Sequence, residues 1–273
     1  MGRFSKLERE TQDALARQKA LEEKSRELPS APQRPAVEEY DAPYYIEKGD
    51  DAFFLGVFKE ALQYYSRALQ MDNSSFYPWL GQIYCLIEMG QYKEADLWTG
   101  RALEMFPEDS SLLSLRAMMY ARRGMYKRAL NTTDYAISRK GANAHSYIAR
   151  GYVLLAADNK NANFCFTKAM ELASPSDWKI PMRIGLIYFK NKKYSRGLEF
   201  LLKACALNVT NYYLWFHLGQ CYVKLGFTKK AIEAYQHSLE QNPDYVSAKE
   251  AYVKLTRSSV FSRLMSRLVS VLR

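Results

Sequence analysis

Long hydrophobic runs are missing from this chain of 273 residues, and its amino terminus lacks the apolar stretch of a secretory signal. A helix that crosses a membrane needs about 18 or more consecutive apolar residues, and a signal peptide needs an apolar core after its first basic residues. The sequence therefore predicts neither a membrane span nor export. We expect the protein to be cytoplasmic, either free or peripheral at a membrane surface.

Histidine and cysteine are few, and the motifs of common enzymes are missing. His145, His217 and His237 lie far apart and have no HExxH or CxxC companion, so we expect no metal site. No GxxxxGK[ST] loop cradles a phosphate, and no GxSxG turn presents a nucleophile. We predict a chain without catalytic residues, metal or cofactor. The cysteines have no paired spacing and are expected to be free thiols in a reducing compartment: Cys85, Cys165, Cys205 and Cys221.

A period of 34 residues runs through most of the chain. Stepping back by 34 residues from Gly219 finds the same repeat position at Gly185, Gly151, Ala117, Ile83 and Gly49. Small residues recur at a second position, at Ala61, Ala95, Ala129, Ala162, Gly197 and Ala231. The last repeat reads Trp215, Leu218, Gly219, Tyr222, Ala231, Tyr235 and Pro243. This pattern resembles the tetratricopeptide repeat, which places W, L-G, Y, A, F and P at such intervals.

The resemblance implies an all-α fold, in which helical hairpins stack into a solenoid that winds as a right-handed superhelix. Six repeats are expected, at 42–75, 76–109, 110–143, 144–177, 178–211 and 212–245. A capping helix at 246–257 should cover the last apolar face, which stacked arrays require.

Two features of each hairpin follow from the pattern. Small residues let its two helices approach closely, and Tyr92, Tyr126 and Tyr194 are expected to fill the space beside them. Glycine stands between the helices at Gly56, Gly90, Gly124 and Gly226, where a positive φ can end a helix. Asp158 and Lys192 replace the glycine in repeats four and five.

The two ends of the chain differ from the repeats. Residues 1–28 are a charged helical arm, interpreted either as a solvated helix or as a weak self-association or partner helix. Residues 29–41 are rich in proline and predict an extended linker. Residues 258–273 predict a basic amphipathic helix with apolar residues on one side and arginines on the other: Phe261, Leu264 and Leu268, then Arg263, Arg267 and Arg273. Its destination is an anionic membrane surface, a partner protein or the repeats themselves.

The candidate site follows from the resemblance, because the first helix of each hairpin lines the concave face in the tetratricopeptide-repeat family. The inward repeat positions are mostly apolar or aromatic, which suits a helical or hydrophobic peptide. The alternative is that some of these side chains only pack between helices. The candidate groove residues are Tyr77, Leu80, Tyr84, Met118, Ile148, Tyr152, Met182, Phe189, Tyr213, Phe216 and Gln220.

The sequence thus predicts a non-catalytic scaffold that holds a segment of a partner protein during complex assembly. The Lys, Asn and Arg clamp with which co-chaperones of this family grip acidic tails is absent, since Ile46 and Asp50 stand at its first positions. The alternative is a peripheral membrane adaptor that docks through the last helix. A third hypothesis is RNA binding, from the net charge of +10 and the 21 tyrosines. We do not favour it, because only Lys179 is a clear cation among the inward positions.

Overall fold

The computed structural model describes residues 40–139 and 141–257. The predicted arm at 1–28, the linker up to residue 39 and the basic helix at 258–273 lie outside the described residues. The chain divides into two compact units, residues 1–40 and 41–273. Every feature below belongs to the second unit.

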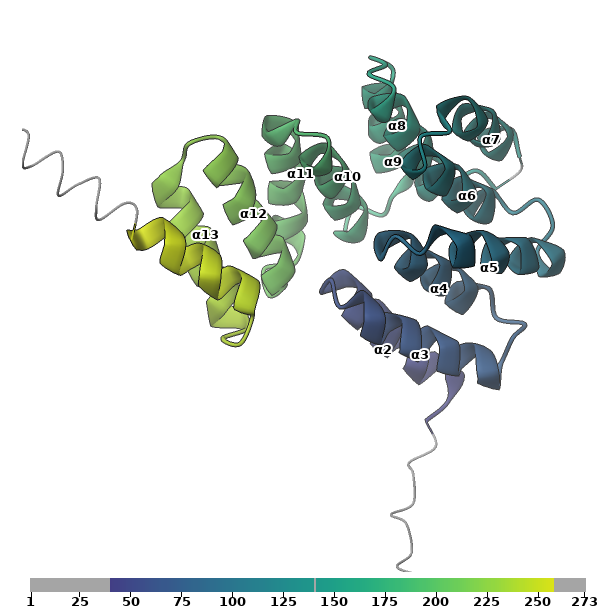
Figure 1. Cartoon of the computed structure of the whole chain (residues 1–273), viewed down its shortest axis with the longest axis horizontal. Coiled ribbons are helices and arrows are strands. Elements are labelled where there is room, and N and C mark those ends of the chain that lie inside the picture. Colours follow the sequence, from purple (N-terminus) through teal and green to yellow (C-terminus); the bar gives the residue numbers. More distant parts are fainter. Residues whose placement is uncertain (1–39, 140, 258–273) are drawn as a thin grey trace, which may run out of the picture. The chain divides into compact units, whose positions relative to one another are not determined.

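Regular structure in the described ranges is entirely helical. Each odd-numbered helix packs on the helix before it, and Figure 1 shows the hairpins following one another along the chain. The helices are α2 (Ala42–Phe54), α3 (Phe58–Met71), α4 (Phe76–Glu88), α5 (Tyr92–Met105), α6 (Ser110–Arg122), α7 (Tyr126–Ser138), α8 (Ala144–Ala156), α9 (Ala162–Leu172), α10 (Lys179–Lys190), α11 (Tyr194–Leu207), α12 (Tyr212–Lys224) and α13 (Thr228–Gln241). A further helix occupies 246–257. None of the described helices is both long and apolar enough to span a bilayer.

Polar side chains cap several of the first helices of the hairpins. The Asp109 carboxylate accepts hydrogen bonds from the amides of Ser111 and Leu112, and Asn143 accepts from the amides of His145 and Ser146. Each cap satisfies amides that have no partner inside the helix. Short polar residues before apolar runs therefore fix where these helices begin.

The turns inside the hairpins confirm the left-handed positions that the sequence predicted. Gly90 has a φ of 77°, and the other three predicted glycines have similar values. Asp158 and Lys192 adopt φ values of 52° and 60° in the two repeats that lack the glycine. A side chain with a Cβ atom is strained in this region, by about 1 kcal/mol.

In four of the six hairpins the close approach depends on a glycine that faces a large side chain, while Ile83 and Ala117 stand at this position in repeats two and three. A Cβ atom on Gly151 would lie 2.5 Å from the Phe166 ring, and a Cβ atom on Gly219 would lie 2.5 Å from the Tyr235 ring. The Tyr65 ring fills the space beside two glycines, Gly49 in its own hairpin and Gly81 in the next one. A larger residue at any of these glycines would therefore push the helices apart.

The rings that face the glycines come from the middle of the second helix, whereas Tyr92, Tyr126 and Tyr194 are the first residues of α5, α7 and α11. Tyr194 packs against the Phe189 ring of α10, and Tyr92 packs against a core cluster. Tyr126 is 42% exposed, so the expectation was wrong for this residue.

The last hairpin is covered by the helix at 246–257. Ala248 is fully buried and packs in one cluster with Phe216 and Tyr235. The fourth hairpin is the irregular one, since α9 has 11 residues where the other second helices have 13 or 14.

Replacing Lys192 by glycine is expected to stabilise the protein by about 0.5–1 kcal/mol, because glycine adopts a positive φ without strain. Lys193→Gly is the control, since Lys193 has an ordinary φ of −89°, so that glycine relieves no backbone strain there. Urea unfolding followed by circular dichroism measures both changes. A loss of stability in Lys192→Gly would contradict the strain assigned to this turn.

Candidate functional site

The first helices of the six hairpins surround a small inner cavity of about 60 Å³. Phe53 and Phe54 of α2 lie on one side of it, and Met182 and Leu186 of α10 also line it. This volume has room for a small side chain or a few water molecules. The inner cavity is therefore a gap in a packed interior and cannot hold a peptide helix.

A larger outer cavity of about 430 Å³ adjoins the inner one, and the two share Phe53, Phe54, Tyr84 and Arg183. Ligand pockets in proteins commonly measure about 300–1,000 Å³. The wall is partly apolar and ring-rich, and its polar members include Asn143, His145 and Lys179. The outer cavity is the part of the concave side that has room for a ligand.

The predicted groove residues separate into three groups. Six line the inner cavity: Tyr84, Met118, Ile148, Tyr152, Met182 and Tyr213. Tyr77 and Leu80 line the outer cavity together with Tyr84, and Tyr77 is 71% exposed. Phe189, Phe216 and Gln220 line neither cavity.

The residues outside both cavities pack around the sixth repeat. Phe216 lies against the rings of Tyr235 and Tyr245. Phe189 contacts the ring of His217. Both ring nitrogens of His217 and the Oε1 atom of Gln220 are buried, and no described residue offers them a hydrogen bond.

The first repeat closes one side of the concave face by contacting repeats five and six. The Asp50 carboxylate of α2 lies 3.0 Å from Nζ of Lys179 in α10. The Asn211 side chain, just before α12, donates to the carbonyl oxygen of Phe54 at 3.1 Å. A Cβ atom on Gly56 would meet the Tyr213 ring at 2.5 Å. These contacts join residues that are more than 120 positions apart in the sequence.

Arg183 lies where the two cavities meet. Its Nη1 donates to Nδ1 of His145 at 2.9 Å, and its guanidinium carbon lies 4.2 Å from the centre of the Tyr84 ring. Its Nε is buried without a hydrogen-bond partner. Among the described residues, no carboxylate forms an ion pair with Arg183. Asp50, which also lines the outer cavity, instead accepts a hydrogen bond from Tyr65 and pairs with Lys179. The guanidinium is held by rings and by one imidazole.

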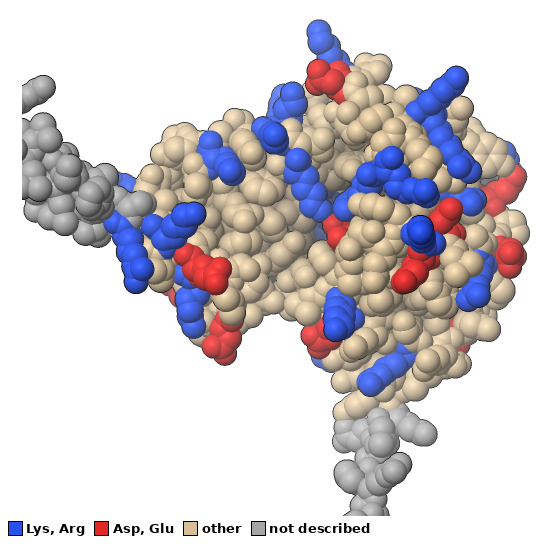
Figure 2. Space-filling view, viewed as in Figure 1, with Lys and Arg blue, Asp and Glu red and all other residues tan. Residues whose placement is uncertain are grey.

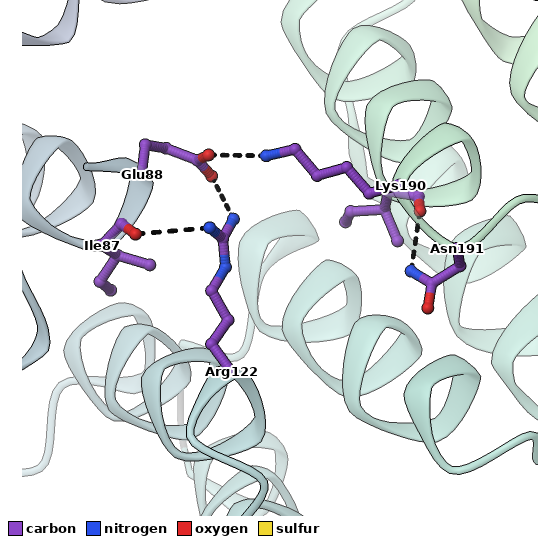
Figure 3. A network of polar contacts seen from close by, with 6 residues as sticks. Ile87, Glu88, Arg122, Lys190 and Asn191 are labelled. Atoms are coloured by element: carbon purple, nitrogen blue, oxygen red, sulfur yellow. Dashed lines mark hydrogen bonds and ion pairs between the residues drawn. The ribbon is translucent and has the colours of Figure 1, made fainter. Parts of the chain in front are cut away.

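Glu88 joins three helices at the other end of the inner cavity, as Figure 3 shows. Its Oε1 accepts from Nη2 of Arg122 in α6 at 2.5 Å, and its Oε2 accepts from Nζ of Lys190 in α10 at 2.7 Å. Burial disfavours the charge of Glu88, but Lys190 and Arg122 outweigh this and keep the pKa of its carboxyl below the usual value. One carboxylate thus holds two cations from repeats three and five.

His145 and His217 are both neutral at physiological pH. Burial is the main cause, since it lowers the pKa of each to about 3. Arg183 and Lys179 also repel a proton on His145, and Lys190 does so for His217. Because Arg183 donates to Nδ1 of His145, that nitrogen is the unprotonated one.

The described residues include no group of three His, Cys, Asp or Glu side chains placed to hold a metal ion. All four cysteines are free and buried. Burial raises the pKa of Cys205 to about 11 and of Cys221 to about 12, so these thiols are protonated and poor nucleophiles.

Two family models match the chain. The tetratricopeptide-repeat model covers residues 55–119, and the model of anaphase-promoting complex, cyclosome, subunit 3 covers residues 155–238. The chain is a tetratricopeptide-repeat protein. Solved structures of similar fold agree with this assignment. The structure of a tetratricopeptide repeat protein from Parabacteroides merdae has a TM-score of 0.51 at 17% identity, with 91% of this chain and 94% of that chain covered.

Other relatives share the repeat at low identity. The Cut9-Hcn1 hetero-tetramer of APC/C has a TM-score of 0.51 at 17% identity, with 79% of this chain and 43% of that chain covered. A CTR9 homolog from Arabidopsis thaliana is 23% identical over 57% of this chain and 14% of its own length. A peroxisomal targeting signal receptor from Candida albicans is 22% identical over 70% of this chain and 33% of its own length. The chain spans a third or less of these two curated relatives.

Several lining residues of this tetratricopeptide-repeat protein were not among the sequence candidates. Phe54 and Arg183 each stand one position after the expected inward position, and Glu88, Arg122 and Lys190 lie at helix ends. One signal was present in the sequence, since Arg183 is the single charged residue between Lys179 and Lys190 in an otherwise apolar helix. Its contacts with Phe53 and Tyr84 could not be found from repeat positions alone.

The two buried histidines should make the stability of this tetratricopeptide-repeat protein depend on pH. Their pKa values of about 3 lie below the unfolded value of about 6.5, so unfolding takes up protons between these limits. The free energy of unfolding should therefore fall as the pH drops from 6.5 toward 3, by about 1.4 kcal/mol per pH unit for each histidine. His217→Phe, which suits the surrounding rings, should reduce the number of protons taken up on unfolding by one. Urea unfolding at several pH values measures this as a smaller slope of the free energy of unfolding against pH. His237→Phe, at an exposed imidazole, is the control, and an equal change of slope there would contradict the assignment.

Proposed function

We propose that this protein is a non-catalytic scaffold that holds an apolar segment of a partner protein in its outer cavity while a complex assembles. The main support for this proposal is the outer cavity, which combines a volume of about 430 Å³ with a wall of large rings from α2 and α4. Concave surfaces of helical repeats are the usual binding faces of such arrays. The partner segment is either helical or extended and presents hydrophobic side chains.

The exposure of the lining residues supports this role. Tyr77 is 71% exposed, and Leu80 beside it is half-buried. Large exposed side chains at the rim of a cavity gain by being covered, at about 25 cal/mol per Å² of apolar area before ordering costs. The residues around the inner cavity contribute to stability instead, because Met118, Ile148 and Met182 are already buried.

The size of the two cavities limits how the segment binds. A helix has a diameter of about 10 Å with its side chains, so it cannot pass into the inner cavity while the first repeat contacts repeats five and six. The segment instead lies along the outer cavity and inserts two or three anchor side chains. Arg183 at the floor favours a segment that places a polar acceptor among its apolar anchors.

The relatives give this proposal a context. The Candida albicans relative is a receptor for a targeting signal by its name, and one family model is that of a subunit of a large complex. Each name belongs to that protein, and the identities are low. They favour protein partners for this chain, and they leave the partner's identity to experiment.

Location and the alternative functions have less support. The four free, buried thiols fit the reducing cytoplasm. Docking on a membrane through Phe261, Leu264 and Leu268 concerns residues outside the described ranges, and no described feature favours it. The same holds for self-association through the amino-terminal arm.

Peptides selected from a phage library of random 12-residue sequences on the full chain should be rich in apolar residues. The double variant Tyr77→Ala/Leu80→Ala should bind them at least about tenfold more weakly, because two apolar anchors of the cavity wall are lost. Fluorescence anisotropy with the selected peptides measures this change.

The matched control is Leu97→Ala/Phe164→Ala, which also removes one leucine and one ring. These side chains are 55% and 69% exposed and line neither cavity. Equal affinity of the Tyr77→Ala/Leu80→Ala variant and the native chain would rule out the outer cavity as the site.

A further inference from the structure

Two of the turns that join the helices of a hairpin are strongly basic. Residues 122–128 and 190–196 together contain eight Lys or Arg and no Asp or Glu. They are the turns between α6 and α7 and between α10 and α11, with the adjoining helix ends. We name these two segments the basic edge.

Contacts bring the two segments of the basic edge together although 60 or more residues separate them. Arg122 and Lys190 hold the same Glu88 carboxylate, as Figure 3 shows. Lys193 lies 3.8 Å from Asp158, which ties the turn between α8 and α9 to the same place. Arg122 and Lys190 therefore lie close together, and each of the two basic turns begins from this shared contact.

Half of the eight cations of the basic edge have no ion-pair partner among the described residues, since Arg122, Lys190, Lys193 and Arg196 are paired. Glu88 is shared by two cations, and in the described residues no ion pair involves Arg123, Lys127 or Lys192, which are all exposed. Figure 2 shows Lys and Arg side chains around the hollow in the face in view, with fewer Asp and Glu among them. A field of one sign at the rim of a hollow attracts anions.

One turn that joins two hairpins carries the opposite charge. Residues 104–109, which join α5 to α6, contain Glu104, Glu108 and Asp109 and no basic residue.

From these observations we infer that the basic edge binds an acidic stretch of the partner protein whose apolar segment the outer cavity holds. The inference rests on the proposed function, which gives the outer cavity a protein partner and is the reason for a polypeptide. Arg122 and Lys190 belong both to the basic edge and to the lining of the inner cavity, which shares four residues with the outer cavity. The two surfaces are therefore close enough for one partner protein to contact both.

The test uses the full chain and a fluorescein-labelled peptide of eight glutamates, which addresses the basic edge without any apolar anchor. The native chain should bind it, more weakly as salt is raised. Arg123→Glu/Lys192→Glu should lower the affinity about tenfold, because two attractive contacts become repulsive. Lys249→Glu/Lys254→Glu is the matched control, with the same change of net charge at exposed residues of the helix at 246–257. The control should lower the affinity by less than about twofold.

Equal losses of affinity in the two double variants would overturn the inference, because they would reflect net charge or the basic residues of 258–273. The inference also fails if a peptide of eight glutamines binds as tightly, or if only phosphatidylserine vesicles or oligouridine RNA distinguish the two variants. The Tyr77→Ala/Leu80→Ala variant should keep the glutamate peptide while losing the selected apolar peptides. The basic edge and the outer cavity can therefore fail separately.

Discussion

The close approach of two helices within each hairpin is the constraint on which the rest of this structure depends. In four of the six hairpins a glycine at this position faces a large side chain of the second helix, as Gly151 faces Phe166. Once the crossing is fixed, each hairpin presents the same two faces, and stacking buries the first helices against one another. The first helices of all six hairpins then face the concave side, where their side chains line the inner cavity.

The sequence was sufficient for those parts of the fold that depend on local contacts. The 34-residue spacing predicted the helical repeat and the glycine turns inside its hairpins. It placed Asp158 and Lys192 at two of these turns, but their left-handed conformation is known only from the structure. The expected role of Tyr126 was wrong, because the repeat pattern gives the identity of the aromatic residues but not how deeply each one is buried. The spacing in the sequence shows which residues recur from repeat to repeat. It does not show the angle at which the two helices of a hairpin pack.

The candidate site was predictable only in part for the same reason. Repeat positions identified residues that face inward, including Tyr84 and Met182, but not how closely the inward faces approach. In the structure the first repeat reaches repeats five and six, which encloses Met118 and Ile148 and leaves Tyr77 and Leu80 at the larger opening. Arg183 is placed by rings from α2 and α4, and these lie about 100 or more residues earlier in the chain. A contact of this kind depends on the summed curvature of several hairpins.

The contacts between the first repeat and repeats five and six have a kinetic consequence. In a linear array each hairpin can form next to a folded neighbour, so that most contacts join residues close in sequence. Asp50 with Lys179 and Phe54 with Asn211 instead join residues separated by 129 and 157 positions. Long loops must close before such contacts can form, which slows folding. The hairpins therefore assemble first, and the joining of the two ends of the array is a late step in folding and an early one in unfolding.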